Sequence, residues 1–166
     1  MKTKHSFLPS LLGISRTVMG KAINQNKMKQ IVLISCVSKK LETKSKAKDL
    51  YVSPLFKKNL KYATSINPDE IFILSAKYGL VGLNKEIEPY DMTLNKMRTN
   101  EIKKWAKVVL NQLNSLTDLK TDEFIFLAGN NYRKYLIPHI TNYKVPMESL
   151  PIGKQLQWLT NMINNE

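Results

Sequence analysis

The stretch IVLISC at residues 31–36 decides the fold class of this chain. A short apolar run rich in β-branched residues is typical of a strand that is buried on both faces of a parallel sheet. Two runs of the same kind follow, IFILS at residues 71–75 and FIFLA at residues 124–128. The sequence therefore predicts three buried, parallel strands.

Helical patterns alternate with these strands. Ser53 is a predicted N-cap, and Pro54 suits the first turn of a helix that runs to about residue 65. Residues 98–116 and 152–164 carry apolar residues at helical spacing. This alternation predicts a three-layer α/β/α domain with a mostly parallel sheet.

The remaining segments give weaker patterns. We expect a polar, lysine-rich loop over residues 37–50 and irregular structure over residues 76–94. After the third strand we expect a helix over residues 130–139, and then a short edge strand at residues 144–147, where proline is tolerated.

The chain is long enough for one domain, which we place at residues 28–166, since 43% hydrophobic content suffices for one core. Residues 1–27 are basic, and their interrupted apolar residues only loosely imitate a signal peptide. Met28 stands directly before the first strand. We interpret residues 1–27 as an extension outside the domain, or as the product of a misassigned start codon.

The net charge is +13, and nearly all of it lies in the first third of the chain. Residues 1–30 contain six cations and no acid, and residues 31–62 contain eight lysines and two acids. A one-sided basic field favours a polyanionic partner, and we expect nucleic acid, DNA in particular. The competing interpretation is a solubilising surface, because lysine outnumbers arginine by 23 to 3.

Other classes of protein are not indicated. Cys36, His5 and His139 are the only cysteine and histidine residues, too few for a disulfide framework or a cysteine-rich zinc site, and we expect no metal or cofactor. No apolar run approaches the roughly 20 residues that cross a bilayer, so we expect no membrane partner and a cytoplasmic location. Walker-type and dinucleotide-binding glycine motifs are absent.

Polar and small residues follow each of the three predicted strands. Because the carboxyl ends of parallel strands meet at one edge of a sheet, we predict a site there for a phosphate and a base. Gly129 lets the backbone approach a ligand closely. The competing interpretation is that loop residues are commonly polar. Candidate binding residues in these segments are Ser35, Cys36, Ser38, Ser75, Lys77, Tyr78, Gly129, Asn130, Asn131 and Tyr132.

Two acids in the loop after the second strand, Glu88 and Asp91, are candidate catalytic residues. A carboxylate that orients water or stabilises an oxocarbenium-like sugar serves N-glycosidic cleavage. The competing interpretation is that they neutralise Lys77 or cap a turn. Cys36, beside two lysines, is a candidate nucleophile, but a free cysteine is more commonly a small core residue.

Six segments in this order resemble a small family of bacterial and phage proteins often grouped near the peroxide-stress protein YaaA. The resemblance covers about residues 30–160. The segments are SCVSKK (35–40), AKDLYVSPLF (47–56), LSAKYGL (74–80), IEPYDMTL (87–94), LAGNNYR (127–133) and PIGKQLQWL (151–159).

The first two segments are also similar to the Cys-Ser-x-x-Lys-Pro-Tyr-Ser region of the archaeosine synthase catalytic domain. Here Ser35 and Cys36 stand in the opposite order, and a longer insert precedes Tyr51. The resemblance implies a uracil-DNA glycosylase-like fold and an activity on bases, such as excision of a modified base. Some relatives are suspected of acting on hypermodified phage DNA, which implies a role in phage defence.

We therefore predict a DNA-directed base-processing hydrolase, in its simplest form an N-glycosylase. Candidates for stacking on an extruded base are Tyr51, Tyr78 and Tyr132, and candidates for reading its polar edge are Asn130 and Asn131. Candidates for phosphate contact are Lys39, Lys40, Lys46, Lys48 and Arg133. Two alternatives are a nucleic-acid-binding protein without catalysis and an enzyme that acts on free nucleotides or nucleosides.

Overall fold

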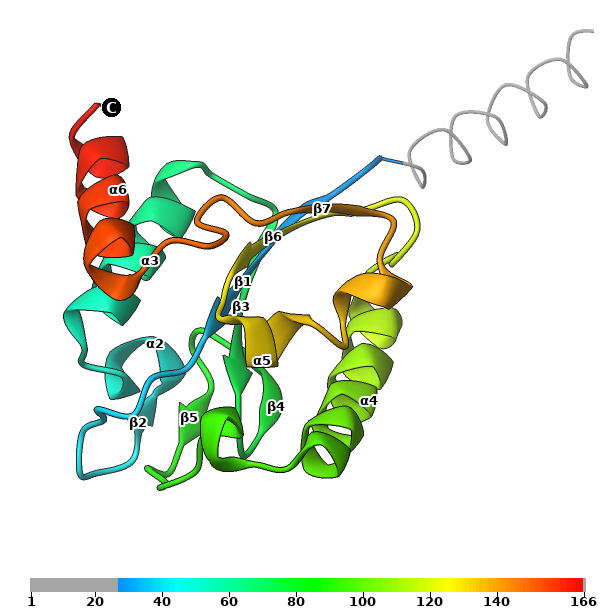
Figure 1. The fold of residues 1–166 in the computed structure, drawn as a ribbon, viewed down its shortest axis with the longest axis horizontal. Coiled ribbons are helices and arrows are strands. Elements are labelled where there is room, and N and C mark those ends of the chain that lie inside the picture. Colours follow the sequence, from blue (N-terminus) through cyan, green and yellow to red (C-terminus); the bar gives the residue numbers. More distant parts are fainter. Residues whose placement is uncertain (1–26, 166) are drawn as a thin grey trace, which may run out of the picture.

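The three predicted strands form the middle of the sheet (Figure 1). The computed structural model describes residues 27–165. In it, β1 (Gln30–Ser35) lies between β3 (Glu70–Ser75) and β6 (Glu123–Leu127), and all three run parallel. The side chains from Ile31 to Ile34 are fully buried because helices cover both faces of the sheet. The prediction of three buried, parallel strands is confirmed.

The sheet has five strands in the order β4-β3-β1-β6-β7. The edge strand β7 (Asn142–Lys144) runs parallel to β6, and the other edge strand, β4 (Gly79–Gly82), runs antiparallel to β3. The edge strand predicted at residues 144–147 is wrong in its bounds, because β7 ends before Pro146, which has no N–H to donate.

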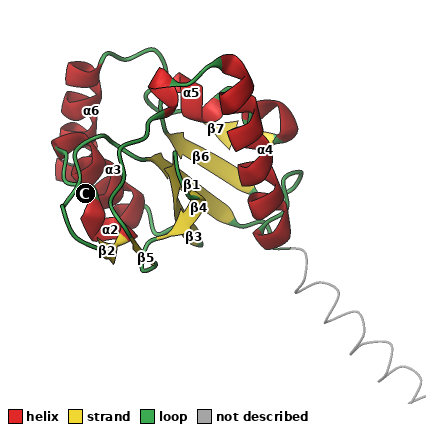
Figure 2. Cartoon of the chain, turned by 90° about the horizontal axis from the view of Figure 1, so that it is seen from below, coloured by secondary structure: helices red, strands yellow, loops and turns green. Residues whose placement is uncertain are grey.

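Helices cover the sheet on two sides, which confirms the three-layer α/β/α arrangement (Figure 2). On one side α3 (Pro54–Ser65) packs against α6 (Ile152–Asn164), and on the other lies α4 (Thr99–Leu116). Ser53 caps α3 as predicted, since its Oγ accepts a hydrogen bond from the Phe56 amide at 3.1 Å.

The prediction of irregular structure over residues 76–94 is wrong in two places, which form the strands β4 and β5 (Glu86–Ile87). Leu80 and Val81 of β4 pair with β3, and the glycines at both ends of β4 hide the strand pattern. The short strand β5 pairs antiparallel with β2 (Ser45–Lys46).

The expected loop at residues 37–50 is likewise only partly irregular. It contains β2 and the single-turn helix α2 (Ala47–Leu50). The pairing of β2 with β5 holds this lysine-rich segment beside the segment that carries Glu88 and Asp91.

The helix expected over residues 130–139 is also wrong. The chain forms a single turn, α5 (Asn130–Arg133), and then the 3₁₀ helix η2 (Ile137–His139). Pro138 disfavours a continuous α-helix here, since a proline restricts the residue before it and its ring clashes with the carbonyl group four residues earlier. A second 3₁₀ helix, η1 (Leu94–Lys96), precedes α4. We interpret residues 1–27 as an extension. Residues 1–26 lie outside the part of the chain that the structure describes.

Candidate functional site

The carboxyl ends of β1, β3 and β6 lie along one edge of the sheet. The register places Ser35 beside Leu74 and Ile34 beside Leu127. The polar segments that follow the three strands therefore leave the sheet at the same edge. In open α/β sheets, ligands bind at this edge.

A cavity of about 540 Å³ opens there, between the ends of β1 and β6 and the helices α3 and α6. We call it the β1–β6 cavity. Small-molecule sites in proteins have volumes of roughly 300–1,000 Å³. Six of the predicted binding residues line it: Ser35, Cys36, Ser38, Lys39, Gly129 and Tyr132. Other elements add the polar residues Asn59, Thr93, Asn95 and Gln155 and the apolar residues Pro54, Leu55, Ile152 and Leu156.

Asn59 lies on the inner face of α3 and lines this cavity. Its side chain is 4% exposed, and within residues 27–165 its Oδ1 has no hydrogen-bond partner. A buried polar atom without a partner costs roughly 1–3 kcal/mol, so its presence in a cavity requires an explanation. Sequence reasoning missed Asn59, although a spacing of three residues from Phe56 and from Tyr62 puts a polar side chain on the buried helix face.

Tyr132 is a buried wall of the cavity, and its hydroxyl connects three segments. The oxygen accepts hydrogen bonds from the Cys36 thiol at 3.3 Å and from the Leu94 amide at 3.3 Å, and Thr93 Oγ1 lies 3.4 Å away. Burial raises the pKa of Tyr132 above its ordinary value. The hydroxyl therefore stays neutral and fixes the segment before η1 against β1.

A second group of tyrosines lies beside the cavity rather than in its wall. The Tyr51 ring is 1% exposed and packs on Phe56, and its hydroxyl lies 2.7 Å from that of Tyr90. Ser75 donates to Tyr90 at 2.8 Å and accepts from the Tyr78 amide at 3.0 Å. The structure therefore does not bring Tyr51, Ser75 or Tyr78 to the lining of the cavity.

The two predicted catalytic acids are exposed and do not line the cavity. The backbone oxygen of Glu88 accepts a hydrogen bond from the Tyr78 hydroxyl at 3.3 Å. Asp91 lies two residues before Thr93, which does line the cavity. Asp91 also influences the pKa of Lys40. Burial lowers that pKa, and the charges of Cys36 and Asp91 counteract part of the lowering.

The predicted phosphate-contacting cations occupy different positions. Lys39 lines the cavity and is exposed, and Lys46 and Lys48 are exposed on β2 and α2. The Lys40 ammonium lies 4.3 Å from the centre of the Tyr90 ring. Lys77 lies 5.3 Å from the centre of the Tyr78 ring, away from the cavity.

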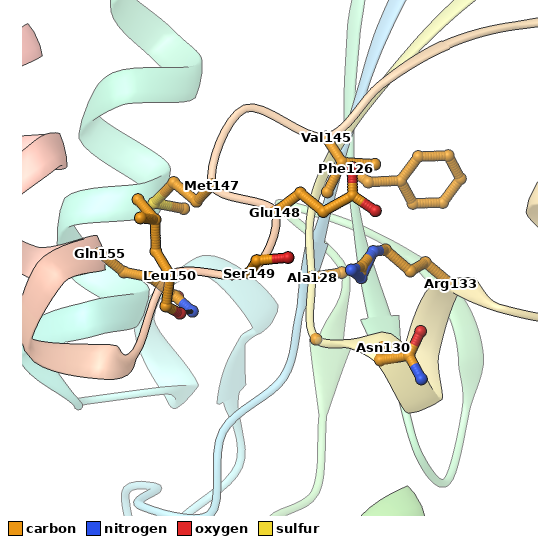
Figure 3. Close-up of a pocket in the computed structure, with 11 residues that line it drawn as sticks. Phe126, Ala128, Asn130, Arg133, Val145, Met147, Glu148, Ser149, Leu150 and Gln155 are labelled. Atoms are coloured by element: carbon orange, nitrogen blue, oxygen red, sulfur yellow. Dashed lines mark hydrogen bonds between the residues drawn. The ribbon is translucent and has the colours of Figure 1, made fainter.

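Arg133 lines a second cavity of about 470 Å³ beside the segment that follows β6 (Figure 3). Arg133 and Asn130 line it from α5, and Glu148 and Ser149 line it from the segment before α6. The two cavities share Ala128, Gly129 and Gln155. Asn131 lines neither, and its amide donates to Asn95 Oδ1 at 2.9 Å.

Residues 27–165 contain neither a group of metal-binding side chains nor a helix that could cross a membrane. No three or more histidine, cysteine or acidic side chains in this part of the chain are grouped so that they could hold a metal ion. No helix among the described residues has the length and apolar content to cross a membrane.

Fold and site together define a three-layer α/β protein with a mixed polar and apolar cavity at the carboxyl ends of its central strands. The chain belongs to a family of unknown function, DUF6884, whose model matches residues 31–161. No curated protein matches it significantly, and neither does any solved structure.

Proposed function

We propose that this protein is a DNA-directed base-processing enzyme with a uracil-DNA glycosylase-like fold, and that it holds a nucleobase in the β1–β6 cavity. One observation carries the proposal: the cavity combines apolar surface with an acceptor, Asn59 Oδ1, that has no partner within residues 27–165, at the edge of the sheet where such folds bind ligands. A planar heterocycle with a polar edge fits a site of that composition.

The surroundings of the cavity suit a nucleic-acid strand. Lys39 stands in its lining, and Lys46 and Lys48 extend the cationic surface along β2 and α2. Cations that contact phosphates give affinity that is independent of base sequence and falls with salt. A strand lying on this surface would present one extruded base to the cavity.

The simplest reaction is hydrolysis of the N-glycosidic bond of a modified base, such as those of hypermodified phage DNA. Water adds to the sugar C1′, the electron pair of the C–N bond leaves with the base, and the base takes up a proton. Asp91 or Glu88 would orient the water and accept its proton. Asp91 is two residues from the cavity residue Thr93, which favours it for this role.

The alternative of binding without catalysis is favoured by one observation, the exposure of both acids outside the cavity lining. The test is therefore to incubate the protein with unmodified and with hypermodified phage DNA, and to measure abasic sites and released bases. We expect excision from at least one of these DNAs.

Variants separate catalysis from binding. E88Q/D91N should abolish excision while DNA affinity is retained. The control variant D49N/E86Q makes the same change in net charge at exposed positions outside the cavity and should excise normally. Unaltered excision by E88Q/D91N rejects the assignment of the acids. DNA binding without any excised base rejects the glycosylase and supports the binding protein.

A further inference from the structure

Asn59 carries a hydrogen-bond acceptor that has no donor within residues 27–165. Its Oδ1 is buried and without a partner, in a side chain that is 4% exposed and lines the β1–β6 cavity. We infer that Asn59 is a specificity-determining residue that accepts a hydrogen bond from an N–H group of the ligand. The substrate class is then a base with a free ring or exocyclic N–H. This inference rests on the proposed function in taking the cavity as the base pocket.

Neighbouring donors do not serve this acceptor because they are engaged elsewhere. The Gln155 side-chain amide donates to the Leu150 carbonyl at 2.8 Å, and the Cys36 thiol donates to Tyr132. The Lys58 ammonium, next to Asn59 in the chain, donates to Thr160 Oγ1 at 2.6 Å. Within residues 27–165 no donor therefore reaches Asn59 Oδ1, and a ligand in the cavity can supply one.

The surroundings of Asn59 on the inner face of α3 are apolar. The neighbouring inward positions of α3 are Phe56, Tyr62 and Ala63, which belong to the apolar core. A leucine of similar size would pack there without leaving a polar atom unpaired, and it has higher helix propensity. We therefore expect Asn59 to lower the stability of the ligand-free protein, a cost that a hydrogen bond to a bound ligand would offset.

The positions of Lys39 and Asn59 also give the ligand a direction. Lys39 is exposed at the rim of the cavity, whereas Asn59 is buried within it. A nucleotide with its phosphate near Lys39 would insert its base edge toward Asn59. The edge of the base that is far from the sugar is the one that carries the N–H groups used in base pairing, so that edge meets Oδ1.

Matched pairs of free bases test the inference without requiring catalysis. The probes are 1-methyluracil against 1,3-dimethyluracil, and 9-methyladenine against its N6,N6-dimethyl derivative. In each pair, methylation removes the N–H that would face Asn59. We expect the wild-type protein to bind the N–H member of at least one pair, about tenfold or more tightly than its methylated partner. Calorimetry or ligand-observed NMR measures the ratio.

The variant N59L separates a hydrogen bond from steric exclusion. Leucine keeps the branched shape of the side chain and removes the acceptor, so N59L should bind both members of the pair equally. Without ligand, N59L should melt at a higher temperature than the wild-type protein. This increase in melting temperature should be larger than the increase that N161L produces. Asn161 is an exposed helical asparagine of α6, so N161L measures the gain from helix propensity alone.

Each contrary result overturns the inference. One contrary result is a wild-type protein that binds, in every pair, either neither member or both members equally. Another is an N59L protein that still distinguishes the N–H base from its methylated partner. A third is an N59L protein that is less stable than N161L. The proposed function fails separately. N–H-dependent binding without excision from any DNA rejects the glycosylase alone, whereas excision that N59L leaves unchanged rejects the role of Asn59 alone.

Discussion

The hydroxyl oxygens of Tyr51 and Tyr90 lie 2.7 Å apart, and they join the segment after α2 to the segment before η1. Ser75, at the end of β3, donates to the Tyr90 oxygen at 2.8 Å. Three segments that are distant in sequence therefore meet at one buried polar cluster beside the candidate site. The cluster fixes the loop that carries Asp91 relative to the sheet.

Replacing Tyr90 by phenylalanine should destabilise the protein. Y90F removes the oxygen that Ser75 and Tyr51 contact and leaves the buried Tyr51 hydroxyl without that partner. The expected loss is about 1–3 kcal/mol, or roughly 2–4 °C in Tm for each kcal/mol. Calorimetric or denaturant unfolding measures it. The control is Y143F, because Tyr143 is 46% exposed on the edge strand β7, and an equal loss in both variants would contradict the role of the cluster.

The same cluster predicts loss of stability in alkali. Burial raises the pKa of Tyr51 from 10.0 to about 12, and burial also raises the pKa values of Tyr90 and Tyr132. Between pH 10 and pH 12 the unfolded chain therefore loses protons that the folded chain retains. The contribution of these tyrosines to stability should be constant below pH 10 and fall as the pH rises toward 12.

Ultraviolet absorbance of tyrosinate should follow that alkaline transition. Tyr51, Tyr90 and Tyr132 should ionise above pH 10, together with the loss of the fold. Ionisation of these three hydroxyls near pH 10, with the fold intact, would show that they are not shielded.

Salt dependence should identify the lysines that contact DNA phosphates. The triple variant K39Q/K46Q/K48Q should reduce the slope of log affinity against log salt concentration by about 0.7–0.9 for each lost contact. The matched control is K104Q/K107Q/K120Q, whose lysines are exposed on α4 and the turn before β6. Fluorescence anisotropy over a salt series compares the slopes. Equal slopes in the two triple variants would reject a specific cationic surface.

Two glycines of β4 should respond differently to alanine. Gly79 has φ +72°, and a Cβ there would meet the Gln112 side chain, whose Oε1 accepts the Leu80 amide at 2.8 Å. G79A should cost about 1–3 kcal/mol through backbone strain and disruption of that hydrogen bond. At Gly82 a Cβ would meet nothing within 4 Å, so G82A should change the free energy of unfolding much less. Chemical denaturation of both variants makes the comparison.

The sequence predicted the layers of the fold because the strands 31–36, 71–75 and 124–128 have no competing pattern. It also predicted the edge of the sheet where the cavity lies, since that edge follows from parallel topology. It did not predict β4, because a four-residue strand with glycine at both ends has neither the length nor the alternation that identifies a strand.

The composition of the cavity was harder to predict than its location. Asn59 and Gln155 enter it from α3 and α6, and their contribution depends on how these two helices pack against each other. Tyr51 illustrates the reverse error. A tyrosine in a motif suggests a stacking surface, but its ring here is part of the core, and only tertiary contacts distinguish the two roles.

The central position of β1 has a consequence for how the domain is made. Gln30 at the start of β1 contacts Glu123 of β6 across 93 residues of chain, and α6, which completes the cavity wall, comes later still. During synthesis β1 emerges well before its partner β6, and such long-range pairing is slow. Until β6 pairs with it, one edge of β1 has unpaired backbone groups. Such an exposed edge favours misassembly, which a chaperone can prevent. The cavity, and with it the capacity to bind a ligand, therefore forms only after α6 has been made and has packed against α3.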